Sequence, residues 1–223
     1  MLFELDHLFI CASIGAPEAA HLLEFGLTEG TPNMHSGQGT ANRRFFFRNA
    51  MIELLWVHDS NEAQSKATQD TRLWERWSGR GKGTCPFGLC FRPSAPNISE
   101  LPFAAWEYRP RYLDSSRTIH VGTNSQVLSE PMLVYLAFGQ RPERHSTIKP
   151  ESLEHPAGLT KVTRVELVSP HSQTVSTELQ DVIHANLVGM HEGGEYGIEL
   201  GFDGERQGNT ADFRPSLPLI FRW

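Results

Sequence analysis

The sequence contains little cysteine, and its three cysteines do not form a disulfide framework. Cys11, Cys85 and Cys90 are odd in number, and each lies in an apolar segment typical of a strand. Buried thiols in a reducing cytoplasm explain this arrangement better than disulfides do. Cys85 and Cys90 also lack the spacing of a zinc motif.

Long apolar runs are missing as well. No stretch reaches the roughly 20 residues that a membrane helix needs. Two acidic residues lie within the first six positions, which is wrong for a signal peptide. We therefore expect a soluble, cytoplasmic protein that does not use a membrane as a partner.

Basic charge is outweighed by acidic charge, and the formal net charge is -6. The arginines are scattered, so a nucleic-acid partner is not expected. The glycine-rich segments lack the Lys-Ser/Thr of a phosphate loop, which argues against a nucleotide cofactor. No serine or cysteine lies in a nucleophile-elbow pattern, which argues against acyl-transfer hydrolysis.

What the sequence does contain is a recurring order of strand, helix and further strands within 223 residues. We predict a first module over 1–60, a helical connector over 61–83, a second module over 84–140, and a linker with a shortened third module over 141–223. The expected strands are 2–11, 43–48, 51–57, 84–92, 106–113, 118–122, 132–138, 161–168, 196–202 and 217–223. The expected module helices are 16–25, 98–105 and 175–187. This pattern predicts an α+β fold.

Two ionisable residues lie in apolar rows of the first module. Strict alternation places His7 on one strand face with Phe3, Leu5, Phe9 and Cys11, and places Glu53 with Met51, Leu55 and Val57. An isolated buried carboxylate costs several kcal/mol (about 2 or more) unless it is paired or bound. Either the two residues pair inside the core, or both face a cavity that binds a metal or a polar substrate group.

Several motifs resemble the glyoxalase-like members of the vicinal oxygen chelate superfamily, which includes glyoxalases, extradiol dioxygenases and bleomycin-resistance proteins. In the first module they are "LDHLFI", "FGL", "HSGQGTANRRFFF" and "MIELLWV"; later ones are "PFGLCFRP", "EPMLVYLAFGQRP" and "HPAGLTKVTRVELVSP". The resemblance implies paired βαβββ modules that form a curled, cup-shaped mixed sheet with flanking helices. It also implies that His7 and Glu53 stand where the first module supplies metal ligands.

The second module departs from this pattern. Its first strand, "TCPFGLCF", offers neither His nor Glu, and Val134 stands opposite the position of Glu53. Completing a site for Zn, Mn, Fe, Co or Ni would need a third ligand, for which His120, His155 and Glu130 are the candidates.

The loop and hairpin after the first helix supply candidate substrate contacts. Gln38, Thr40 and Asn42 lie in a glycine-containing loop whose backbone N–H groups can approach a ligand, or whose polar groups cap their own turn. Arg44 and Phe46 follow on the hairpin. An inward Arg44 would indicate an anionic substrate, whereas an outward one would be a solvated surface residue.

Two functions are consistent with these residues. The first is an enzyme of lyase, isomerase or dioxygenase type, in which His7 and Glu53 hold a divalent metal and move a proton of a small-molecule substrate. The second is a metal-free protein that binds or sequesters a hydrophobic compound, as bleomycin-resistance proteins do. Whether the third module forms a homodimer contact is left open by the sequence.

Overall fold

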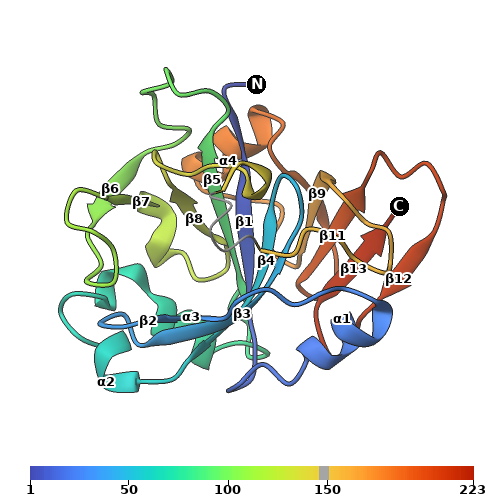
Figure 1. Ribbon diagram of the computed structural model, residues 1–223. Helices are drawn as coiled ribbons and strands as arrows, with labels where there is room; N and C mark the ends of the chain where they lie inside the picture. Colours follow the sequence, from blue (N-terminus) through green and yellow to red (C-terminus); the bar gives the residue numbers. More distant parts are fainter. Residues whose placement is uncertain (146–150) are drawn as a thin grey trace.

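The computed structural model describes residues 1–145 and 151–223, and its central feature is an eight-stranded mixed sheet (Figure 1). Its strand order is β2-β3-β4-β1-β5-β8-β7-β6. The first four are β1 (Phe3–Cys11), β2 (Asn33–His35), β3 (Thr40–Phe46) and β4 (Met51–Val57); the others are β5 (Phe87–Pro93), β6 (Ala105–Tyr108), β7 (Ile119–Gly122) and β8 (Met132–Tyr135). The sheet curls so that its two ends turn to the same side, which makes a cup.

The two halves of the sheet have the same internal pairing. β1 runs parallel to β4 and β5 runs parallel to β8, while β1 and β5 pair antiparallel at the centre. The cup is therefore built from two similar four-stranded halves. This confirms the α+β class and the curled mixed sheet that the resemblance implied.

Short helices connect these strands. They are α1 (Ala19–Phe25), α2 (Ser60–Ala63), α3 (Leu73–Ser78), and the 3-10 turns η1 (Gln69–Thr71), η2 (Thr123–Gln126) and η3 (Pro142–Arg144). Gly26 ends α1 in the left-handed conformation, with a φ of 101°. In α3, Trp77 donates to the carbonyl of Ala12 at 2.8 Å and so ties the connector to the end of β1. No helix of the described residues is both long and apolar enough to cross a membrane.

The C-terminal part forms a second sheet of five strands in the order β10-β9-β11-β13-β12. Its elements are β9 (Val162–Ser169), α4 (Thr177–His184), β10 (Gly189–Glu192), β11 (Gly197–Phe202), β12 (Thr210–Asp212) and β13 (Leu219–Arg222). The sequence did not predict the short strands β10 and β12. The expected linker over 141–156 falls partly outside the described residues.

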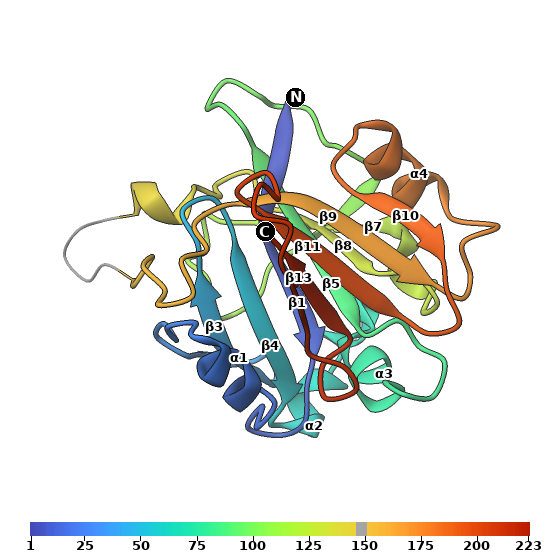
Figure 2. The same cartoon turned by 90° about the vertical axis from the view of Figure 1, so that its right-hand side faces the viewer.

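The five-stranded sheet covers the back of the eight-stranded sheet, as the view in Figure 2 shows for β9, β11 and β13 in front of β1, β4 and β5. Leu8, Ile52 and Leu89 of the first sheet share one buried cluster with Leu167 and Leu200 of the second. A different cluster, which includes Phe9, Leu55, Cys90, Val121 and Val134, lines the inside of the cup. Each central strand thus has one face in the core between the sheets and one face in the cup.

One predicted strand face is wrong, because β1 contains a bulge. The pairing with β5 shifts between Leu5 and His7. Phe3 and Leu5 therefore join the core between the sheets, whereas Phe9 and Cys11 face the cup. An extra residue in a strand switches the alternation from that point on. In this strand the bulge brings Asp6 beside His7.

The helix predicted over 98–105 is also wrong. The connection from β5 to β6 contains no helix, and β6 already begins at Ala105. Pro96 and Pro102 lie in this connection, and a proline inside a helix removes a hydrogen bond and clashes with the preceding turn. The second half therefore lacks an equivalent of α1.

Candidate active site in the cup

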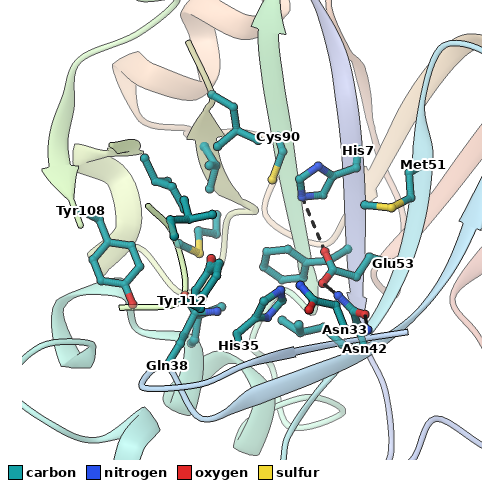
Figure 3. Close-up of a pocket in the computed structure, with 18 of the residues that line it drawn as sticks. His7, Asn33, His35, Gln38, Asn42, Met51, Glu53, Cys90, Tyr108 and Tyr112 are labelled. Carbon is teal, nitrogen blue, oxygen red and sulfur yellow. Dashed lines mark hydrogen bonds and ion pairs between the residues drawn. The ribbon is translucent and has the colours of Figure 1, made fainter. Parts of the chain in front are cut away.

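The cup encloses a cavity of about 190 Å³ with one polar end. His7 on β1 and Glu53 on β4 stand at that end, and Figure 3 shows their side chains pointing toward each other. Apolar side chains from the second half of the sheet make the opposite wall, including Val121, Met132 and Val134. The cavity compares with an engineered cavity of roughly 150 Å³ that binds benzene. A single ring or a short branched chain fits it.

The imidazole of His7 and the carboxylate of Glu53 are close without being bonded tightly. His7 Nε2 lies 3.6 Å from Glu53 Oε2, which is longer than a direct hydrogen bond. The other oxygen of Glu53 accepts a hydrogen bond from the side-chain amide of Asn42. Asn42 Oδ1 in turn accepts from the backbone N–H of Asn33 at 2.8 Å. Asn42 therefore fixes one carboxylate oxygen and leaves the second one available.

A network of charged side chains bonds the Nδ1 atom of His7, the ring nitrogen that does not face Glu53. His7 Nδ1 donates to Asp6 Oδ1 at 2.7 Å, and Arg92 donates to the other oxygen of Asp6 at 3.0 Å. Arg92, whose side chain is only 1% exposed, also donates to Glu4 at 2.9 Å. Arg141 completes the network by binding Glu4. A carboxylate bonded to one ring nitrogen fixes the orientation of the imidazole and points the other nitrogen into the cup.

The environment of His7 keeps its imidazole charged. Burial alone would lower the pKa of His7, but the Cys90 sulfur and the Asp6 carboxylate beside it raise that pKa well above its usual 6.5. Burial would raise the pKa of Asp6, yet the hydrogen bond from His7 and the charge of Arg92 lower it. For Cys90, burial raises the pKa and outweighs the lowering by the neighbouring His7.

The predicted substrate-contact residues divide into three groups. Gln38, Asn42 and Arg44 line the cavity. Thr40 is fully buried behind it and bonds Gln38 Nε2 at 2.8 Å and His35 Nδ1 at 2.9 Å, so it positions the loop. Phe46 lies outside the cup cavity, with the Arg44 guanidinium 4.9 Å over its ring.

The structure does not bring the candidate third ligands to His7 and Glu53. His120 lies on β7 between Ile119 and Val121, which face the cavity, so its own side chain faces away. Both ring nitrogens of His155 are engaged by backbone groups, the N–H of Thr28 and the carbonyl of Phe46.

Glu130 is buried beside η2 and α4, where it accepts from Ser176 and Asn124. It is therefore also committed to a structural contact outside the cavity.

Sequence reasoning missed His35 and Tyr112, which line the cavity from opposite sides of the cup. Their rings stack at a centroid distance of 4.6 Å. His35 is on the edge strand β2, and Tyr112 follows β6 in a loop. Neither residue carries a local motif. Only the curvature of the sheet, which the sequence does not spell out, brings them together.

The metal hypothesis requires a set of donors that the cup lacks. Within residues 1–145 and 151–223, no group of three or more His, Cys, Asp or Glu side chains is placed to hold an ion. His7 Nε2 and Glu53 Oε2 give two donors, and catalytic zinc sites use three protein ligands. The residues present therefore do not fit a tightly held catalytic metal.

The raised pKa of His7 leads to a pH dependence of stability. A histidine whose folded pKa lies above its unfolded value of 6.5 stabilises the fold below pH 6.5, and this contribution is lost as the pH rises through the folded pKa. We expect the free energy of unfolding to fall above neutral pH, by up to about 1.4 kcal/mol per pH unit. For the His7→Gln variant, the free energy of unfolding should fall less steeply with rising pH. Urea titrations between pH 6 and roughly 9 measure both slopes; equal slopes would contradict the expectation.

Taken together, the fold and the site define a cup-shaped α+β protein with a small, mostly apolar cavity and an acid–imidazole pair at one end. The sequence pattern of the glyoxalase-like domain family matches residues 5–183. The chain therefore belongs to the glyoxalase-like domain family, which confirms the resemblance of its motifs to glyoxalase-like proteins.

Two solved structures are similar to the chain at low sequence identity, and the one with the higher TM-score has the same fold. A hypothetical protein from Staphylococcus aureus is 11% identical, with a TM-score of 0.52, over 100% of this chain and 99% of that one. A methylmalonyl-CoA epimerase in complex with methylmalonyl-CoA is 13% identical, with a TM-score of 0.39, over 64% of this chain and 100% of that one. No curated protein sequence matches the chain.

Proposed function

We propose that the protein is an enzyme of isomerase or lyase type that moves a proton at a carbon atom next to a carbonyl group. The observation that carries this proposal is the placement of Glu53 Oε2 and His7 Nε2, 3.6 Å apart, at the polar end of an otherwise apolar cavity. A base and a hydrogen-bond donor that converge on one point are what such a reaction needs.

In this proposal Glu53 is the base. Its oxygen Oε2 takes the proton from the substrate carbon, while Asn42 holds Oε1 in place. The same carboxylic acid then returns the proton to a different position or face, or to a leaving group. Because the carboxylate is buried, little water competes for the proton.

His7 supplies the complementary charge. Its imidazolium donates from Nε2 to the carbonyl oxygen, where negative charge develops as the proton leaves carbon. The Asp6 carboxylate on Nδ1 keeps the ring in this orientation and keeps it charged. His7 therefore stabilises the enolate without needing to lose its own proton.

Exchange of hydrogen for deuterium tests this function before the natural substrate is identified. The purified protein is incubated in D2O with a panel of small ketones, aldehydes and 2-oxo acids that carry apolar groups, and loss of the α-proton signal is followed by NMR. We expect catalysed exchange for at least one compound, and no catalysis by the His7→Ala/Glu53→Ala double variant. A panel that binds but never exchanges would refute proton transfer.

Metal removal provides a separate prediction. His7 and Glu53 are the residues that would hold a divalent ion, but with two donors they do not hold one firmly. We expect the exchange activity to survive dialysis against a chelator, and elemental analysis to find metal far below one ion per chain. Activity that is lost on chelation and restored by one ion would show instead that the reaction is metal-dependent.

The second candidate function, ligand binding without chemistry, is favoured by a specific observation. The part of the cavity wall that comes from the second half carries Cys90, Met132 and Val134, which are all buried, and Val134 stands at the position that corresponds to Glu53. A hydrophobic compound would be bound by this wall alone. Nanomolar binding of an apolar compound that is unchanged by the double variant would support this function.

The three cysteines are free and buried in the structure. We propose that the protein works in a reducing compartment such as the cytoplasm, where buried cysteines without disulfides are usual.

A further inference from the structure

A second cavity, of about 410 Å³, adjoins the cup, and we call it the outer cavity. Five residues line both cavities: His7, Arg44, Met51, Leu136 and Phe138. The remaining lining residues of the outer cavity are Asp6, Phe46, Arg117, Gly139, Gln140, Pro142 and His145. The two cavities are therefore consecutive compartments, and His7 stands at the junction between them.

The outer cavity differs from the cup in its charge. The guanidinium groups of Arg44 and Arg117 lie 4.9 Å over the rings of Phe46 and Phe138, so both are held against the cavity wall by aromatic side chains. His7 adds a third positive group. Asp6 is the one carboxylate among the residues that line this cavity, and it is already bonded by His7 and Arg92.

The two arginines are not fully used by the protein itself. Arg44 donates from Nε to the carbonyl of Thr31 at 2.6 Å and forms an ion pair with Glu151 through Nη2 at 3.5 Å, so among the described residues its Nη1 has no such partner. Arg117 is exposed, and no carboxylate of residues 1–145 or 151–223 lies within ion-pair distance of it. Guanidinium groups with free donors bind carboxylates in two-point contacts.

We infer that the outer cavity binds the carboxylate of a small organic acid whose apolar group occupies the cup. This inference rests on the proposed function and names its substrate class. With the carboxylate at Arg44 and Arg117 and the apolar group against Val121 and Val134, the carbon atoms in between lie beside His7 and Glu53. The order of the compartments thus selects acids that react near the carboxyl end, such as 2-oxo acids or acids branched at C2.

The test compares each acid with its uncharged amide. Acid and amide pairs, from butyrate and butyramide to phenylacetate and phenylacetamide, are titrated calorimetrically against the wild-type protein, Arg117→Gln, Arg44→Gln and Arg117→Lys. We expect the wild-type protein to prefer at least one acid over its amide by on the order of tenfold. Arg117→Gln should reduce this preference several-fold, Arg44→Gln should also reduce it, and Arg117→Lys should retain part of it.

The matched control is Arg109→Gln. Arg109 is an exposed arginine that lines neither cavity and pairs with Glu107. The same charge is removed, so the acid preference should not change. Thermal unfolding of each variant checks that it is folded. Arg117 is exposed, and its side chain contacts the Phe138 ring without an ion pair to the described residues, so Arg117→Gln should stay folded and can be tested even if Arg44→Gln is unstable.

The inference is overturned if no acid in the panel is preferred over its amide, or if the preference survives in both arginine variants. Failure of the proposed function looks different. In that case the acid preference and its loss in Arg117→Gln are observed, but no compound exchanges its α-proton. A third outcome is α-proton exchange in neutral ketones with no preference for acids over amides. It would support the proposed function and refute the carboxylate site.

Discussion

Replacing Glu53 with glutamine is expected to lower the rate of α-proton exchange by about 10²-fold to 10⁴-fold, the range that a positioned general base contributes. Glutamine has nearly the same shape, and its side-chain oxygen still accepts from Asn42. It cannot accept a proton from carbon. The variant therefore removes the base and leaves the cavity, the ligand and His7 in place.

The stability of Glu53→Gln separates a chemical effect from a structural one. Glu53 is 4% exposed, and a neutral amide is cheaper to bury than a carboxylate, so we expect the variant to unfold at the same or a higher urea concentration. Glu24→Gln, at an exposed position on α1, is the matched control and should retain full activity. If Glu53→Gln keeps exchange within about threefold of wild type, another group is the base.

The pair at the centre of the site was predictable because it breaks the apolar pattern. A carboxylate in a row with Met51 and Leu55, and a histidine in a row with Phe9 and Cys11, each need an explanation that an ordinary core strand does not provide. Their meeting followed from the parallel pairing of β1 and β4, in which Phe9 lies opposite Glu53. The sequence alone was therefore sufficient to identify both residues and the two strands on which they lie.

The support behind the pair was not predictable, because it depends on a backbone irregularity and on distant residues. Strict alternation placed Asp6 on the face opposite His7, whereas the bulge in β1 lets the two side chains bond at 2.7 Å. Arg92 reaches Asp6 from β5, 86 residues further along the chain. Nothing near Asp6 in the sequence indicates this partner.

Arg44 and the C-terminal sheet show a second limit of pattern reading. Alternation cannot show which face of the β3–β4 hairpin turns inward. The sequence therefore allowed Arg44 to be either a solvated surface residue or an inward one, and the structure places it in the cavity wall.

The sequence likewise predicted four of the six elements after residue 160 but not that they form their own sheet. Which surfaces pack together is decided by the whole chain rather than by a local period.

The largest effect on stability is expected from Arg92→Met. The guanidinium of Arg92 is almost completely buried and bonds Glu4, Asp6 and the carbonyl of Asn49. Methionine fills much of the space but removes one of the two cations that bond each carboxylate, which leaves Glu4 with Arg141 alone and Asp6 with His7 alone. Breaking a buried pair from one side costs about 3–5 kcal/mol, so we expect the free energy of unfolding in urea to fall by that amount.

Arg141→Met is the matched control for this prediction. Arg141 also bonds Glu4, but its side chain is 32% exposed, so water can replace it and the loss should be about 1 kcal/mol or less. The stability lost in Arg92→Met is expected to come from the Asp6 carboxylate, which no longer has the arginine as a partner. Adding Asp6→Asn to Arg92→Met should then recover part of the free energy of unfolding, because the amide needs no cation. A double variant that is less stable than Arg92→Met would show that lost packing around the arginine stem, rather than an unpaired charge, accounts for the effect.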